Sequence, residues 1–191
     1  MKCCWKVFLF FNLIFWRIAV SWGCDSLEIS GLASAALTEM ANPKSVHLSI
    51  RKTGPPCSFF VAATQGQSQM AQREMRNLAG HVPYNIYIDS ARTRVLKDVT
   101  LATANEILTG SFSGSGEETS EFDVTVSDAP AGVLQPGNYT DDVIFNVHKG
   151  SLDPAAPLMH SRAFHVSRFI APLRKVAIVN SGAPSDSSQT Q

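Results

Sequence analysis

Tyr84-Asn85-Ile86-Tyr87-Ile88, entered through Pro83 and closed by Asp89-Ser90, is the strongest strand signal in the chain. Aromatic and β-branched residues favour extended backbone because they pack well on a pleated, half-buried surface. Proline before the segment and polar turn residues after it limit its length. The segment therefore predicts a β-strand at the centre of the chain.

Similar signals continue on both sides of this strand. Val46, Leu48 and Ile50 alternate with polar neighbours, and Val143, Phe145 and Val147 form one apolar face. No long stretch shows helical periodicity. The predicted class is all-β, a β-sandwich. The other expected strands are 45–51, 57–62, 107–112, 122–126 and 142–148. We expect 107–112 and 122–126 to pair as a hairpin across the Gly/Ser-rich segment 113–118, and the polar segment 65–80 to form a long loop or an irregular edge.

Residues 1–23 are typical of a secretory signal peptide. Lys2 and Lys6 precede an apolar run that is too short and too interrupted to span a bilayer. Small residues, Ser21 and Gly23, occupy the positions that signal peptidase requires if cleavage falls before Cys24. An uncleaved signal anchor and lipid attachment at Cys24 are the two alternatives. The sequence thus predicts an exported protein.

The predicted mature chain keeps two of the four cysteines, Cys24 and Cys57. An even number of cysteines in an exported protein favours a disulfide. The alternative is two unrelated thiols, one buried and one lipidated. A bond between them would connect the start of the mature chain to the predicted strand 57–62.

Composition changes towards the C-terminus. Residues 24–150 form the expected sandwich domain, and 151–180 form an extension in which 164–170 and 174–179 are expected strands. Residues 181–191 are rich in Ser and Gln, which predicts a disordered tail. The role of this extension is left open by the sequence.

Catalytic and cofactor-binding motifs are not evident in the sequence. The five histidines (His47, His81, His148, His160 and His165) lack the convergent spacing of a metal site, and no nucleophile elbow or phosphate-binding loop occurs. The formal net charge of the whole chain is zero, and no basic cluster indicates nucleic-acid binding. We therefore expect no enzyme activity, no cofactor and no small-molecule substrate, and a small secreted hydrolase is the least favoured alternative.

Two separated motifs resemble the spore coat protein U domain family. Residues 79–93 carry a Tyr-Asn-x-Tyr strand followed by Asp89-Ser90-Ala91-Arg92-Thr93, and 135–143 carry a Pro-x-Gly-x-Tyr-x-Asp-x-Val motif. Gln72-Arg73-Glu74-Met75 is similar to the Arg-x-Met segment of that family. Residues 95–98 depart from its usual Trp-Gly-Asp-Gly turn, and 126–128 from its Tyr-Gly-Arg. The resemblance covers about residues 24–149, and its expected structural residues are Arg73, Tyr84, Asn85, Tyr87, Asp89, Arg92, Gly137, Tyr139 and Asp141.

The resemblance implies a structural subunit of a surface appendage or coat. Domains of this family are similar to archaic chaperone–usher pilins, whose incomplete immunoglobulin-like sandwich exposes a groove that an added strand fills, so the resemblance implies an immunoglobulin-like, pilin-like sandwich here. Its implied partners are a periplasmic pilus chaperone, an outer-membrane usher and neighbouring pilin-like subunits. A monomeric periplasmic or lipid-anchored binding module on the same sandwich is the alternative.

The predicted cleavage before Cys24 leaves little chain that could act as a donor strand at the N-terminus. Two interpretations follow from this. The chain is a tip-like subunit that accepts a strand without donating one, or one of the C-terminal segments 164–170 and 174–179 fills the groove within the same chain. The sequence does not choose between them.

Overall fold

The computed structural model of the chain describes residues 23–68, 72–78, 80–129, 132 and 134–172. Its secondary structure is entirely β in these residues, which confirms the predicted class. The ten strands are β1 (Ser26–Ser30), β2 (Ala35–Leu37), β3 (Lys44–Thr53), β4 (Cys57–Ala63), β5 (Arg73–Asn77), β6 (Gly80–Tyr87), β7 (Leu108–Phe112), β8 (Glu118–Asp128), β9 (Gly137–Lys149) and β10 (Leu158–Ile170).

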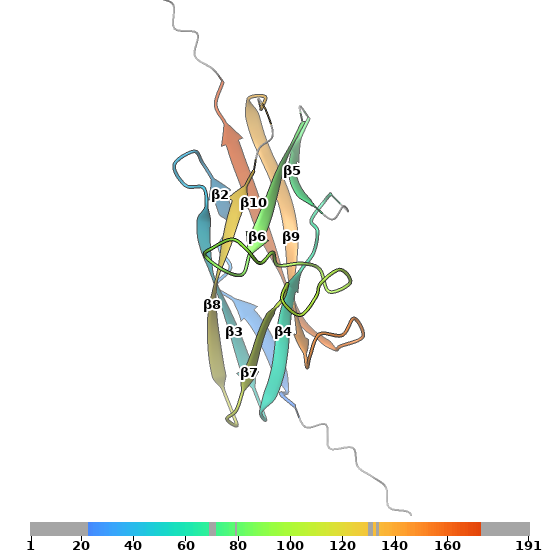
Figure 1. Cartoon of the computed structure of the whole chain (residues 1–191). Helices are drawn as coiled ribbons and strands as arrows, with labels where there is room; N and C mark the ends of the chain where they lie inside the picture. The colour runs from blue at the N-terminus through green and yellow to red at the C-terminus, as the bar shows by residue number, and fades with distance from the viewer. Residues whose placement is uncertain (1–22, 69–71, 79, 130–131, 133, 173–191) are drawn as a thin grey trace, which may run out of the picture.

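The strands form two layers of one curled sheet (Figure 1). One layer has the order β1-β3-β8-β6-β5, and the other has the order β7-β4-β9-β10-β2. A bridge between Arg76 of β5 and Thr140 of β9 joins them. All neighbours are antiparallel except β10 and β2, which are parallel. This arrangement of an antiparallel sandwich is the immunoglobulin-like architecture that the sequence predicted.

The core lies between the two layers. Val46, Leu48 and Ile50 of β3 are buried there, as the alternating pattern predicted. From the opposite layer Phe145 meets Phe164 edge to face, with ring centroids 5.4 Å apart. Because successive side chains of a strand point to opposite faces, these alternating residues place one apolar face of each layer against the other.

Strand β4 differs because both of its faces are buried. Phe59 and Val61 point into the main core, whereas Phe60 and Ala62 form a second small cluster with Ile107. The segment between β6 and β7 covers this outer face, and Ala63 donates a backbone hydrogen bond to Lys97 in it. Double burial explains why β4 reads as a continuous apolar run rather than an alternating one.

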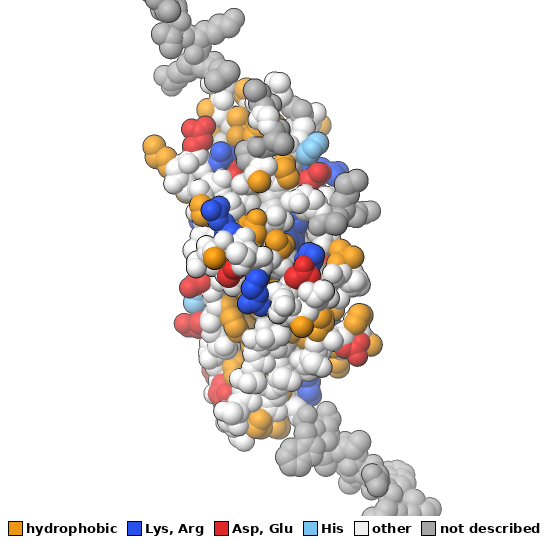
Figure 2. All heavy atoms as spheres, in the orientation of Figure 1, with side chains coloured by type: hydrophobic (Ala, Val, Ile, Leu, Met, Phe, Trp, Pro, Cys, Tyr) orange, Lys and Arg blue, Asp and Glu red, His pale blue; other side chains and the backbone are white. Residues whose placement is uncertain are grey.

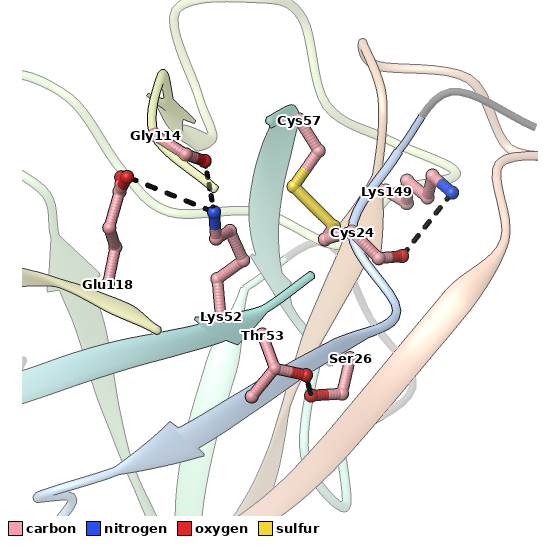
Figure 3. Close-up of a disulfide and its surroundings, with 8 residues drawn as sticks. All are labelled: Cys24, Ser26, Lys52, Thr53, Cys57, Gly114, Glu118 and Lys149. Atoms are coloured by element: carbon pink, nitrogen blue, oxygen red, sulfur yellow. Dashed lines mark hydrogen bonds and ion pairs between the residues drawn. A yellow bond between two sulfur atoms is a disulfide. The ribbon is translucent and has the colours of Figure 1, made fainter. Parts of the chain in front are cut away.

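The predicted disulfide is present. Cys24 and Cys57 are bonded, with their Cα atoms 5.4 Å apart, and the bond attaches the chain ahead of β1 to the start of β4 (Figure 3). Beside it, the fully buried Lys52 donates to the carbonyl of Gly114 at 2.6 Å, and its ammonium lies 5.7 Å from the Phe112 ring centre. The N-terminal end of the sandwich is therefore held by one covalent bond and one buried cation.

Two details of the prediction were wrong. Strands β7 and β8 follow each other but do not pair: β7 pairs with β4, and β8 pairs with β3 and β6. The connection 113–117 therefore crosses between layers instead of closing a hairpin. The segment 65–80, expected as a long loop or an irregular edge, contains the regular strand β5, which pairs with β6.

The C-terminal part of the prediction is tested only in part. The expected strand 164–170 exists as the second half of β10, which pairs with β9 along the sheet. The expected strand 174–179, the tail 181–191 and residues 1–22 of the signal peptide lie outside the described residues. Within the described ranges, no helix is both long and apolar enough to cross a bilayer.

Candidate functional site

Strand β10 occupies the position between β9 and β2. Its register with β9 runs from Leu158 opposite His148 to Ile170 opposite Gly137. On its other side Val166 lies opposite Ala35 in the parallel pairing with β2. Both edges of β10 are thus engaged in its second half, as expected for the last strand of a complete immunoglobulin-like sandwich.

Alternate side chains of β10 fill the space between the layers. Phe164, Val166 and Arg168 are buried, with 2%, 0% and 7% of their surface exposed. Ile170 is partly buried against the same core. Main-chain pairing combined with alternate side chains in pockets is how an added strand binds to a sandwich groove. Here the strand that fills the groove belongs to the same chain.

One of these inward residues is charged. The Nε of Arg168 lies 3.2 Å from Oδ2 of Asp128 at the end of β8, in the opposite layer. Asn42 holds the same carboxylate: its Nδ2 donates to Oδ1 of Asp128, and its Oδ1 accepts from the Asp128 backbone amide at 3.2 Å. Burial raises the pKa of Asp128, and the Arg168 charge opposes that rise. The two layers are therefore joined at this end by a buried ion pair.

The family-motif residues Arg73, Tyr84 and Asp141 are also buried between the layers. The Tyr84 hydroxyl donates to Oδ2 of Asp141 at 2.6 Å. Oδ1 of Asp141 accepts from the backbone amides of Gln67, at 2.8 Å, and Asp142, at 2.9 Å. Burial, together with the hydrogen bond to Asp141, raises the pKa of Tyr84 well above its usual range, so the hydroxyl remains a donor. The network ties β6, β9 and the β4–β5 connection together.

Arg73 satisfies three backbone carbonyls that have no strand partner. Its Nε donates to Thr64, its Nη1 to Leu96 and its Nη2 to Ala63, each at 2.7 Å. Burial lowers the pKa of this guanidinium, while Tyr84 and Asp141 raise it. Because unpaired buried carbonyls are costly, Arg73 stabilises the ends of the β4–β5 connection and of the covering segment.

Tyr139 forms a tyrosine corner at the start of β9. Its ring is buried, and its hydroxyl donates to the carbonyl of Gln135 at 2.9 Å, four residues earlier. Such a contact is a hallmark of the corresponding strand in immunoglobulin-like domains. Gly137 beside it has φ +148°, and a Cβ there would lie 2.8 Å from Nδ2 of Asn77. The motif around Gly137 and Tyr139 thus fixes where β9 begins.

The other motif residues lie at the end of β6. The Asp89 carboxylate accepts from the amides of Thr93 and Arg94, both at 3.0 Å, and these hydrogen bonds with that from the Thr93 hydroxyl lower its pKa. Arg92 has φ +59° in this turn. Asn85 and Tyr87 contact each other, 3.3 Å from Nδ2 to the hydroxyl oxygen. These four residues shape a turn at the surface and do not meet the network around Asp141.

The side chains that could bind a metal do not gather at one place in the described part of the chain. No group of three or more His, Cys, Asp or Glu residues there could hold a metal ion. His47 and His165 are exposed and lie beside Asp123 and Asp142 respectively. On the face drawn in Figure 2, basic and acidic side chains are interspersed rather than gathered by sign.

Three buried charged residues were not predicted from the sequence: Asp128, Arg168 and Lys52. Each occupies an inward position of a strand, where the alternating pattern predicts an apolar residue. Arg168 nevertheless continues the series Phe164, Val166 and Ile170 at spacing two. A charged residue that interrupts such a series is the signal that could have identified a buried ion pair.

Comparison with known proteins identifies the family. The model of the family described as Spore Coat Protein U domain matches residues 29–146. The match ends within β9, so β10 lies beyond it. No curated protein sequence matches the chain.

Several solved structures of fimbrial proteins are similar at low identity. The CooA pilin subunit from enterotoxigenic Escherichia coli has 13% identity and a TM-score of 0.49, covering 77% of this chain and 99% of CooA. The CssB subunit of the same organism, complemented with a donor strand from CssA, has 15% identity and a TM-score of 0.37, covering 76% and 97%. CfaE, the adhesive subunit of CFA/I fimbria of enterotoxigenic Escherichia coli, has 9% identity and a TM-score of 0.45, covering 79% of this chain and 50% of CfaE.

The structural similarities are too weak to carry an argument about function. The sequence match, in contrast, spans more than half of the chain and includes both motifs. Arg73, Tyr84 and Asp141 come from three separate motifs and lie close together in the core. The chain therefore belongs to the Spore Coat Protein U domain family.

Proposed function

We propose that this chain is an exported, non-catalytic structural subunit of a surface appendage or coat. Its assembly uses a periplasmic chaperone, an outer-membrane usher and strand complementation. The proposal rests on the position between β9 and β2. One strand, β10, occupies it, and its alternate side chains are buried in the core. Membership of the family supports the same role.

The position matters because an empty groove is unstable. Without β10, the core-facing residues Val143 and Phe145 of β9 would lose Phe164 beside them in the same layer, and the edge of β9 would lose its ladder partner. Exposed apolar surface next to an unpaired edge leads to aggregation. A subunit of this fold therefore needs an occupant at every stage of export.

In the chain on its own, β10 is that occupant. Residues 150–157 connect β9 to β10, and Lys149 donates a backbone hydrogen bond to Pro157, which closes this loop. The strand is thus held beside β9 at a high effective concentration. We propose that this is a self-complemented subunit, in preference to a tip-like subunit that waits for a strand from elsewhere.

The same observation favours a second candidate. A sandwich that is complete within one chain has no need of a neighbouring subunit, as in a monomeric periplasmic or lipid-anchored binding module. The two candidates differ in what the cell makes from the chain: an assembled structure at the surface, or a single folded domain in the periplasm.

Fractionation of cells separates these candidates. Cells of the source organism that produce the epitope-tagged full chain are sheared, and surface, periplasmic and membrane fractions are compared by gel electrophoresis before and after boiling. The proposed subunit gives a ladder of high-mass species in the sheared fraction that boiling collapses, with chaperone and usher cross-linked to the chain in the periplasm. A monomer in the periplasm alone, with no cross-linked partner, contradicts the proposal and supports the binding module.

A further inference from the structure

The groove that receives β10 contains a buried charge. Asp128 is 6% exposed, and its carboxylate faces β10 from the opposite layer. The other inward residues of this strand meet apolar partners, as Phe164 does with Phe145. A strand that binds in this groove must therefore satisfy one anion in an otherwise apolar environment.

Arg168 satisfies that anion at one register only. Sliding β10 by one residue along β9 would turn its apolar side chains outward, which burial forbids. Sliding it by two residues keeps the faces but moves Arg168 to the level of Val166 or of Ile170. Asp128 would then lose its partner, and a guanidinium would enter the apolar core. Burial of the apolar face therefore excludes register shifts by an odd number of residues, and the ion pair excludes shifts by an even number.

The ion pair contributes more to selectivity than to stability. Desolvation dominates at Asp128, since its pKa is raised even with Arg168 beside it. The contact is also an ion pair without a hydrogen bond, because Oδ2 of Asp128 and both Nε and Nη1 of Arg168 lack a hydrogen-bond partner among the described residues. A well-packed apolar pair at the same place would often be as stable or more so. The buried Asp128 carboxylate instead makes binding less favourable for any strand that has no cation opposite it.

We propose that Asp128 is a selectivity-determining residue of the groove between β9 and β2. The groove accepts a strand that has an aromatic anchor and, four residues later on the same face, an arginine or lysine, as β10 has with Phe164 and Arg168. An all-apolar strand from another protein leaves the buried Asp128 carboxylate with Asn42 but without a cation, so the groove rejects it. The inference uses the strand position on which the proposed function rests, but the selectivity is a property of the purified chain.

A double-mutant cycle on the full chain, with the disulfide intact, tests the coupling. Urea unfolding is measured for the wild type, Arg168→Leu, Asp128→Asn and the double variant. We expect Arg168→Leu to lower the folding constant roughly 100-fold when Asp128 is present, and less than about 10-fold in the Asp128→Asn background. Arg168→Lys should restore most of the loss. The exposed pair Arg51–Glu117, 2.8 Å apart, is the matched control, and Arg51→Leu should change the constant less than about 5-fold.

A strand-capture experiment tests the selectivity itself. Full chain carrying Phe164→Ser and Val166→Ser, which weaken its own β10, is refolded with labelled peptides of sequence 158–170 that have either Arg or Leu at position 168. We expect at least about 10-fold preference for the Arg peptide, and loss or reversal of that preference when Asp128→Leu is added to the chain.

The outcomes are decisive in each arm. Equal capture of both peptides, or an Arg168→Leu chain as stable as the wild type, overturns the inference. If the Arg168→Leu variant does not fold, the inference is supported when the Arg168→Leu/Asp128→Leu double variant does fold. If neither variant folds, the peptide-capture experiment decides. The proposed function is tested by cell fractionation, which does not depend on these results. The selectivity inference and the proposed function can therefore fail separately.

Discussion

The Tyr84 hydroxyl donates to the Asp141 carboxylate across the sandwich, at 2.6 Å, and so joins β6 of one layer to β9 of the other. Both residues are completely buried. The two residues are 57 positions apart in the chain. Their hydrogen bond therefore aligns the two layers.

Tyr84→Phe removes only the hydroxyl and leaves the ring in place. Asp141 keeps its two backbone donors but loses the third partner of a buried charge. We expect a loss of about 1–3 kcal/mol in the free energy of unfolding, measured by urea denaturation. Tyr87→Phe is the control, because that partly exposed hydroxyl accepts only a 3.3 Å hydrogen bond from Asn85. Equal effects of the two substitutions would contradict the assigned role.

Gly66 packs directly on the Asp141 carboxylate. It has φ +66°, and a Cβ at this position would lie 2.0 Å from Oδ2 of Asp141. Gly66→Ala should therefore cost about 1–3 kcal/mol through the clash, in addition to the backbone strain. Gly116→Ala isolates the strain alone, since Gly116 has φ +93° and nothing within 4 Å of its Cβ position. Thermal melts in which Gly66→Ala costs no more than Gly116→Ala would exclude the close contact.

The disulfide restricts the unfolded chain. Cys24 and Cys57 are 33 positions apart, and closing a loop of that length contributes about 3–4 kcal/mol in the chain-entropy model. The Cys24→Ala/Cys57→Ala chain should lose this amount in urea unfolding, and the wild type should lose it on adding reductant. If reductant also lowers the free energy of unfolding of the alanine variant, the loss seen in the wild type cannot be assigned to the disulfide.

Glu106 is the residue whose acid titration the structure predicts most directly. It accepts from Lys97 Nζ at 2.6 Å and from the amide and hydroxyl of Thr103, and the resulting pKa is about 2, below the usual 4.5. Because the folded-state pKa is the lower one, its stabilising contribution is complete above pH 4.5 and is lost as the pH falls towards 2. An NMR titration of the Glu106 carboxyl carbon should give a midpoint near 2, which Lys97→Met raises. A midpoint near 4.5 that Lys97→Met leaves unchanged would refute the contact.

Sequence patterns predicted the strands better than their pairing. The alternation in 45–51 and 142–148 located β3 and β9, because a half-buried strand must alternate. The pairing of β7 with β4 rather than β8 depends on how the 113–117 connection crosses between layers, which no local pattern encodes. Strand β5 was missed since only Arg73 and Met75 point inward, and one of them is charged.

The candidate site was predictable in outline and not in its charges. The family motifs identified Arg73, Tyr84 and Asp141, which meet in the core. Asp128 and Arg168 are 40 positions apart and belong to no shared motif, so only the fold brings them together. The sequence left open whether a C-terminal segment fills the groove, and the pairing of β10 with β9 and β2 answers this for 158–170.

Hydrogen exchange shows whether β10 occupies the groove in the isolated chain. The purified full chain, expressed without a chaperone, is first shown to be a monomer by native mass spectrometry, and amide exchange is then followed by residue. The account predicts that the amides of Phe164 to Ile170 on β10 exchange as slowly as their partners Gly137 to Val143 on β9. Exchange of these β10 amides at the rate of a free peptide, with β9 protected only after a chaperone or a donor peptide is added, would contradict it.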